Sequence, residues 1–167
     1  DGVSSTALLM TVFTKLGFNI DYYLPDRHSE GYGLHIESLQ KLIPKYDLLI
    51  TVDCGITALD EVDYAKDKID MIITDHHLPR EILPDAFAII NPTQTHCNYP
   101  NKNLCGVGVA FKLCQGLYQS LNKDIHELEN YLDIVALGTI ADIVPLVDEN
   151  RRIVKKGLAN IQNLGIK

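Results

Sequence analysis

The sequence predicts an α/β fold, a parallel β-sheet flanked by helices, with a helical C-terminal portion. Short runs rich in β-branched residues, at 47–52, 71–74 and 86–90, alternate with stretches of helical spacing. This alternation is typical of parallel strands joined by right-handed crossovers. After about residue 105 the patterns are all helical, and 167 residues are enough for one domain with its own core.

The first part of the chain predicts a helix, a strand and a second helix. Residues 1–17 begin with small polar residues suited to a cap, space their apolar residues by about 3.6 and end in glycine, so we expect a helix. Residues 18–24 alternate well enough to predict a strand that ends at Pro25. A polar loop at 26–33 then leads to an amphipathic helix at 34–43.

The middle of the chain supplies the central strands. Residues 47–52 predict a buried strand, and residues 57–68 predict a helix whose early acids and late lysines complement its dipole. Residues 71–74, Met-Ile-Ile-Thr, predict the central strand because β-branched side chains pack well on a pleated surface. A further strand at 86–90 is closed by an Asn-Pro pair.

The last part of the chain is expected to be helical. Its first helix is entered through two glycines, and its last helix exposes four basic residues between 151 and 156. The predicted elements are a polar loop at 93–104, helices at 106–121 and 125–137, a loop at 138–145 that places Asp142, and a helix at 149–164.

Composition excludes several classes of protein. No apolar run approaches the ~20 residues of a membrane-spanning helix, so no membrane partner is expected. The formal charge of −7 argues against binding nucleic acid through a broad basic face, but it allows a nuclease whose acids hold cations. The four cysteines show no CxxC spacing, which favours reduced thiols in a cytoplasmic protein.

Acidic residues recur where the predicted strands end. Asp53 terminates one strand, and Asp75, followed by His76 and His77, terminates the next. Because the carboxyl ends of parallel strands form the edge where ligands bind, these side chains are expected to converge. For each acid taken singly, a role in a turn is the alternative. Converging carboxylates repel one another unless a cation neutralises them, so the set favours a metal site.

Two more acids are candidates for the same site. Asp1 begins a helix that would follow a lost strand, and Asp142 is a further candidate ligand, with a helix cap as its alternative role. Carboxylates with an imidazole suit Mn²⁺, Zn²⁺ or Fe²⁺ and, where oxygen ligands dominate, Mg²⁺. Around two cations about 3.5–4 Å apart, such a set describes a site that cleaves phosphoesters, since one metal acidifies a water and both stabilise charge on phosphate oxygens.

The order of these motifs resembles that of a known family. Asp75-His76-His77 is similar to the signature of the DHH phosphoesterase superfamily, and two further stretches resemble its RecJ branch of single-strand-specific 5′→3′ DNA exonucleases. The other superfamily motifs are Asp1-Gly2, Val52-Asp53-Cys54-Gly55 and Gly138-Thr139-Ile140-Ala141-Asp142. The RecJ-like stretches are Pro25-Asp26-Arg27 with Glu30-Gly31-Tyr32-Gly33-Leu34, and Leu-Cys-Gly-Val-Gly-Val-Ala-Phe-Lys at 104–112.

The resemblance implies roles for individual residues. The metal ligands would be Asp1, Asp53, His76 and Asp142. Among them Asp53 would bridge two cations. The catalytic residues would be His77, which would contact the scissile phosphate, and Asp75, which would orient the adjacent histidine without touching the metal.

Four residues are candidates for binding substrate. Arg27 is one because a guanidinium matches phosphate geometry, with an ion pair that anchors its loop as the alternative. Gly106 and Gly108 would let backbone amides at a helix start approach phosphate, or would serve close helix packing. Tyr32 lies in a glycine-flanked loop near the proposed site.

Two parts of the family pattern are missing from the chain. The family's first motif carries additional acids before the position of Asp1, and a substrate-binding domain follows the catalytic one. We therefore expect residues 1–167 to be a DHH catalytic domain, a fragment that lacks its first strand and the C-terminal domain. Such a fragment is expected to bind at most one divalent cation well and to have weak or no activity.

The resemblance implies a Mn²⁺- or Mg²⁺-dependent 5′→3′ exonuclease that hydrolyses phosphodiester bonds of single-stranded DNA in repair and recombination, with replication or recombination proteins as further partners. One alternative is a DHH phosphodiesterase or phosphatase acting on oligoribonucleotides, cyclic dinucleotides or polyphosphate. Another is a non-catalytic module that binds nucleic acid or a replication partner. The stretches at 30–34 and 106–112 favour the first interpretation.

Overall fold

The computed structural model describes residues 1–26 and 31–164 and has the predicted α/β architecture. In chain order the elements are α1 (Gly2–Lys15), α2 (Ile36–Leu42), β1 (Leu48–Val52), α3 (Leu59–Ala65), β2 (Asp70–Thr74), β3 (Ala88–Ile90), α4 (Gly106–Ser120), the 3₁₀ helix η1 (Ile125–Tyr131), α5 (Leu132–Ala141) and α6 (Asp148–Leu164).

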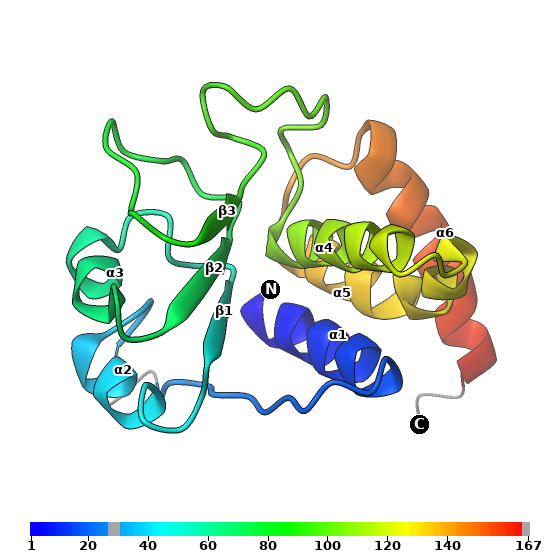
Figure 1. The fold of residues 1–167 in the computed structure, drawn as a ribbon. Coiled ribbons are helices and arrows are strands. Elements are labelled where there is room, and N and C mark those ends of the chain that lie inside the picture. The colour runs from blue at the N-terminus through cyan, green and yellow to red at the C-terminus, as the bar shows by residue number, and fades with distance from the viewer. Residues whose placement is uncertain (27–30, 165–167) are drawn as a thin grey trace.

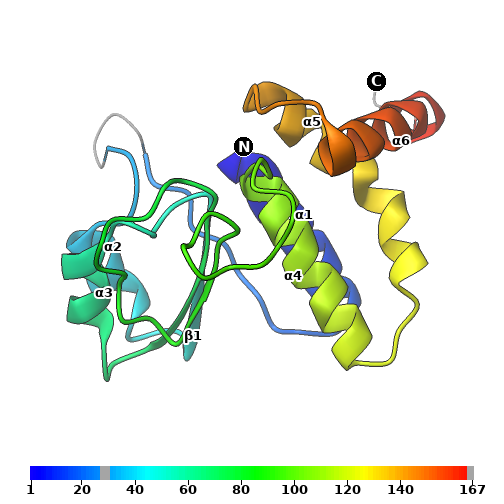
Figure 2. The same ribbon diagram turned by 90° about the horizontal axis from the view of Figure 1, so that it is seen from above.

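The three strands form one parallel sheet in the order β1-β2-β3. Helices α2 and α3 lie on one face of this sheet, and α1 and α4 lie on the other (Figures 1 and 2). Successive strand residues point to opposite faces of the sheet, so side chains on the two faces belong to separate hydrophobic cores. Met71 and Ile73 join the core beneath α2 and α3, whereas Ile50 and Val52 pack against the core of the helical side.

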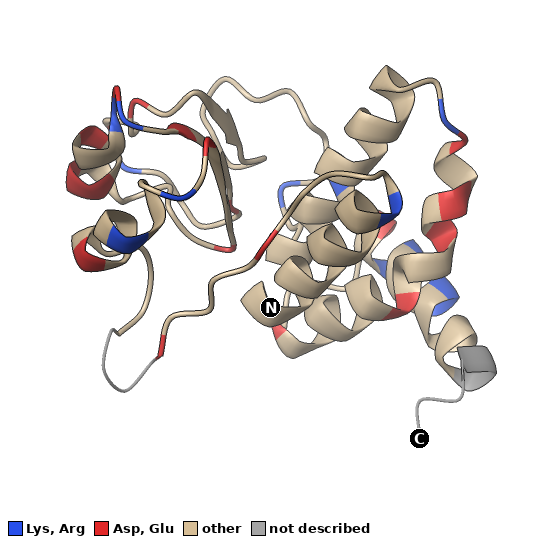
Figure 3. Ribbon diagram, turned by 60° about the horizontal axis from the view of Figure 1, so that its bottom comes forward, with Lys and Arg blue, Asp and Glu red and all other residues tan. Residues whose placement is uncertain are grey.

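The larger core lies among α1, α4, η1, α5 and α6. Helices α1 and α4 each carry a single charged residue, Lys15 and Lys112, whereas α6 carries six. Figure 3 shows charged residues on the outer helices and on the loops. Helix α6 crosses α5 closely at Gly157, where a Cβ atom would lie 2.1 Å from the carbonyl oxygen of Leu132. Among the described residues, no helix is both long enough and apolar enough to cross a membrane.

Three predicted elements are wrong in detail. Residues 18–24 form no strand; Phe18, Tyr22 and Leu24 are exposed, and the segment runs between α1 and α2 without a neighbouring strand to pair with. The helix predicted at 125–137 is divided into η1 and the start of α5.

The third correction concerns the loop predicted at 138–145. Residues 138–141 are the last residues of α5, because buried Gly138 and Thr139 pack within the helical side. The Thr139 hydroxyl also donates to the Val135 carbonyl one turn earlier, which leaves the helix intact. Asp142 therefore sits at the helix end, as its C-cap.

Candidate metal centre

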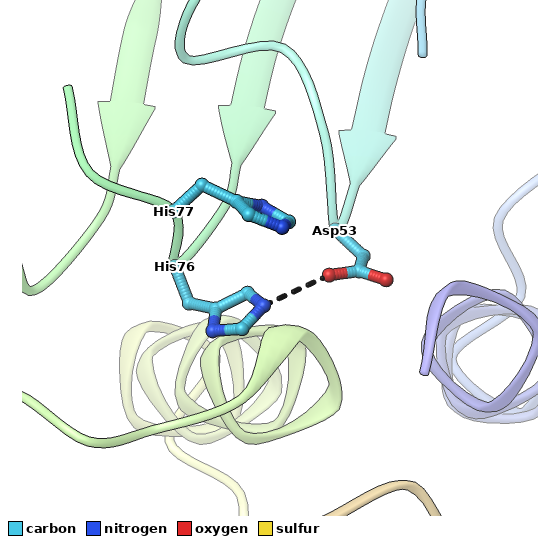
Figure 4. A group of neighbouring side chains, drawn as sticks. All are labelled: Asp53, His76 and His77. Carbon is cyan, nitrogen blue, oxygen red and sulfur yellow. Dashed lines mark ion pairs between the residues drawn. The ribbon is translucent and has the colours of Figure 1, made fainter. Parts of the chain in front are cut away.

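The carboxyl ends of β1 and β2 bring Asp53 and His76 face to face (Figure 4). The Asp53 amide donates to the Thr74 carbonyl at 3.0 Å, which extends the strand pairing by one residue. Asp53 then adopts a left-handed backbone with φ of 60°, a conformation that is uncommon outside glycine and recurs at functional sites. Its Oδ1 lies 3.1 Å from Nε2 of His76.

Two further carboxylates reach the same imidazole from the helical side. Nε2 of His76 lies 3.9 Å from Oδ2 of Asp1, which precedes α1, and 3.7 Å from Oδ2 of Asp142, which ends α5. Gly138 permits this approach, since a Cβ atom there would lie 2.6 Å from Val107 and 3.1 Å from Oδ1 of Asp1. The structure thus places all four predicted metal ligands at one edge of the sheet.

The electrostatics of this cluster favour a cation. Burial lowers the pKa of His76, but the carboxylate of Asp53 and the negative charges of Asp142 and Asp75 outweigh it, so the pKa is raised. Oδ1 of Asp53 and Nε2 of His76 are both buried, and apart from their own approach at 3.1 Å, which lacks the geometry of a hydrogen bond, neither has a partner among the described residues. Buried polar atoms left in this state are costly, and a shared cation would satisfy them together.

The donor atoms also fit a divalent ion in number and type. Two overlapping groups have ligand atoms within 4.8 Å of one another: Asp53 with His76 and His77, and Asp1 with His76 and Asp142. Carboxylate oxygens with imidazole nitrogens match the preferences of Mn²⁺ and related ions. The geometry therefore adds His77 to the possible ligands, whereas the sequence suggested for it a contact with phosphate.

Asp75 lies behind the cluster and is almost fully buried, with 1% of its surface exposed. Its Oδ1 accepts the backbone N–H groups of His76 and His77, and it lies 2.7 Å from Nδ1 of the His77 ring. Its Oδ2 accepts the N–H of Ile56. The ring that Asp75 orients is therefore that of His77, two residues further on.

His77 has the most open position in the cluster, with 59% of its side chain exposed. Because Nδ1 is bound to Asp75, the other nitrogen, Nε2, is left for an external partner. The two histidine rings lie 4.5 Å apart between centroids. An imidazole with one fixed and one available nitrogen can bond to a phosphate oxygen or to a metal.

The glycines at the start of α4 serve packing in this structure. The N–H groups of Gly106 and Val107 donate to the Asp1 carboxylate, and a Cβ atom on Gly106 would lie 2.7 Å from Cβ of Asp53. Buried Gly108 packs against Leu104. The amide of Gly106 is thus bound to an acid of the cluster, which favours the packing alternative over the predicted contact with phosphate.

The remaining predicted substrate residues lie outside this geometry. Tyr32 is 77% exposed in the loop before α2, and its contact with substrate stays a prediction. Arg27 lies outside the described residues. Sequence reasoning missed Asn91 and Thr93, whose side chains bond to the His77 carbonyl. The available signal was the Asn-Pro pair after β3, which predicts a strand end but not this contact.

The fold and the cluster together define an α/β domain with a metal centre of carboxylate and imidazole donors at the carboxyl edge of its sheet. The chain belongs to the DHH family, whose N-terminal domain matches residues 1–139.

Known proteins similar to the chain are named as nucleases. It is 45% identical to the single-stranded-DNA-specific exonuclease RecJ of Bacillus subtilis, over 100% of this chain and 21% of that protein. It is 44% identical to the RecJ of Escherichia coli, over 97% of this chain and 30% of that protein. The chain therefore spans less than a third of either curated relative.

Solved structures agree with these similarities. The crystal structure of an exonuclease RecJ bound to manganese matches with a TM-score of 0.87 and 36% identity, over 96% of this chain and 40% of that one. RecJ from Thermus thermophilus in complex with Mn²⁺ matches with a TM-score of 0.82 and 32% identity, over 97% of this chain and 23% of that one.

Proposed function

We propose that this chain is the catalytic domain of a metal-dependent exonuclease that hydrolyses phosphodiester bonds of single-stranded DNA in the 5′→3′ direction. The observation that carries the proposal is the convergence of Asp1, Asp53 and Asp142 on one imidazole, that of His76. Similarity to RecJ exonucleases over essentially the whole chain supports the choice of substrate.

Four side chains would hold Mn²⁺ or Mg²⁺ in this proposal: Asp1, Asp53, His76 and Asp142. A bound divalent cation would supply an acidified water and would neutralise charge on the phosphate. The protein contributes preorganised groups around that centre. Asp75 fixes the His77 ring through Nδ1, which leaves Nε2 beside the cluster and available to a phosphate oxygen before substrate arrives.

The proposal includes a longer polypeptide, because the curated relatives named above extend far beyond the region that this chain matches. Contacts with the DNA strand would then come largely from outside these residues, which is consistent with the net charge of −7. We place the protein in the cytoplasm, in DNA repair and recombination, with replication or recombination proteins as partners. Four free cysteines support a reducing compartment.

The test is Asp53→Ala in the full-length protein, assayed on single-stranded DNA labelled at the 5′ or the 3′ end. We expect release of mononucleotides from the 5′ end by the unchanged protein and loss of at least a hundredfold in kcat for the variant. Asp85→Ala is the matched control, since Asp85 is an exposed acid paired with Lys66. Unchanged activity of Asp53→Ala would refute the catalytic assignment, and preference for dinucleotides over DNA would refute the substrate.

A further inference from the structure

We propose that Asn91 and Thr93 are positioning residues, which hold the main chain of His77 so that its ring is presented to the substrate phosphate. The effect on catalysis rests on the proposed nuclease function, whereas the contacts with the His77 main chain do not depend on it. Both residues follow β3, the strand beside β2, and both reach across to the segment that carries the two histidines.

The contacts converge on a single atom, the carbonyl oxygen of His77. Nδ2 of Asn91 donates to it at 2.9 Å, and the Thr93 hydroxyl also lies 2.9 Å from it. The same hydroxyl lies 2.7 Å from Oδ1 of Asn91, which in turn accepts the Thr93 N–H at 2.8 Å. Asn91 is 2% exposed, so its amide is held within a fixed environment.

A simpler explanation accounts for half of this arrangement. Asparagine at a strand end commonly accepts the N–H two residues on, as Oδ1 of Asn91 does from Thr93. That turn requires neither the amide donor of Asn91 nor the Thr93 hydroxyl to reach His77. Both do so, and this part of the network links the chain after β3 to the chain after β2.

His77 needs such support because its ring is largely in solvent. With 59% of the side chain exposed, packing alone leaves the ring free to change rotamer, and ordering it costs conformational entropy. Asp75 restrains the ring at Nδ1. The backbone N–H of Asp75 donates to the carbonyl of Ile90, the residue before Asn91. Asn91 and Thr93 restrain the main chain, so the ring and its backbone are both fixed.

The test uses Thr93→Val, which keeps the shape of the side chain and removes the hydroxyl, together with Thr93→Ser, which keeps the hydroxyl. In the full-length protein we expect Thr93→Val to lower kcat on single-stranded DNA on the order of tenfold with little change in KM, and Thr93→Ser to restore it. Thr95→Val is the control, since Thr95 is exposed two residues further on. Equal activity of the valine variant and the unchanged protein would overturn the proposal.

A double-mutant cycle shows whether Thr93 acts through His77. In a His77→Ala background, adding Thr93→Val is expected to cause no further loss, whereas additive losses would assign Thr93 a purely structural role and refute the proposal. Asn91→Asp, which removes the donor with little change in shape, is expected to behave like Thr93→Val.

A readout without activity separates this inference from the proposed function. In the NMR spectrum of this chain, the proton on Nδ1 of His77 is expected to exchange slowly with water in the unchanged protein and in Thr93→Ser, and faster in Thr93→Val. Unchanged exchange in the valine variant would overturn the positioning role. Altered exchange, together with a full-length protein that does not digest DNA, would leave positioning intact and refute the nuclease function.

Discussion

The carboxylate of Asp75 gives two adjacent histidines different environments. It accepts both of their backbone N–H groups but bonds to the ring of His77 alone. The His76 ring is therefore free to face Asp53, while the His77 ring keeps one nitrogen for an outside partner. The arrangement depends on a carboxylate, because both of its oxygens can accept hydrogen bonds.

We predict that Asp75→Asn destabilises the protein by about 1–3 kcal/mol. An amide group must direct its NH₂ either at the Ile56 N–H or at the N–H groups of the histidines, so at least one buried donor loses its acceptor. Urea unfolding followed by circular dichroism measures the difference. Asp85→Asn, an exposed acid, serves as the control, and equal stability of both variants would contradict this account of Asp75.

At the scale of elements, the packing of α6 on α5 depends on a glycine at the point of contact. Gly157 lets the helices approach so closely that a Cβ atom there would lie 2.1 Å from the Leu132 carbonyl oxygen and 2.5 Å from Cβ of Ala136. Both neighbours belong to α5 and cannot move without shifting that helix. Because α5 ends in Asp142, this crossing also supports the position of one predicted metal ligand.

We expect Gly157→Ala to destabilise the protein by about 1–3 kcal/mol, since overpacking outweighs the better helix propensity of alanine. Gly116→Ala on α4 is the matched control, because a Cβ atom there meets nothing within 4 Å. That substitution is expected to stabilise by about 0.5–1 kcal/mol. Thermal unfolding of both variants checks the opposite signs, and a stabilised Gly157→Ala variant would show that the helices are packed differently.

At the scale of the whole molecule, the site lies where two packed bodies meet. The sheet with α2 and α3 supplies Asp53 and His76 (Figure 4). The helical side supplies Asp1, which precedes α1, and Asp142, which follows α5. A cation bound between them would join both bodies and replace repulsion between carboxylates with attraction. Binding to the folded state alone also raises stability by mass action.

We predict that a titration of this chain with Mn²⁺ reveals at most one tight site and that the chain digests single-stranded DNA weakly or not at all. At a free concentration about a hundredfold above Kd, the ion is expected to raise Tm by roughly 5–10 °C. Asp53→Ala should abolish the rise. Two tight sites together with rapid digestion would contradict the prediction, which calorimetry and a nuclease assay can check on the same sample.

Local pattern was enough to predict most of the fold. The spacing of apolar residues placed α1, α4 and α6 and all three strands, because periodicity reports which side of a segment is buried. The convergence of Asp53 and His76 also followed from sequence, since parallel strands end at one edge of their sheet. The alternation of apolar and polar residues at 18–24 predicted a strand that is not there, because alternation cannot reveal whether a partner strand lies alongside.

What the sequence determined by itself was the order of strands and helices, the family motifs and the set of acids and histidines. The tertiary structure alone decided which atoms those residues meet. In the folded protein the amides of Gly106 and Val107 donate to the Asp1 carboxylate, and the His77 ring bonds to Asp75. The carbonyl oxygen of His77 bonds to the side chains of Asn91 and Thr93. The physical reason is that periodicity records the burial of one segment, whereas a hydrogen bond joins segments whose distance in sequence carries no such signal.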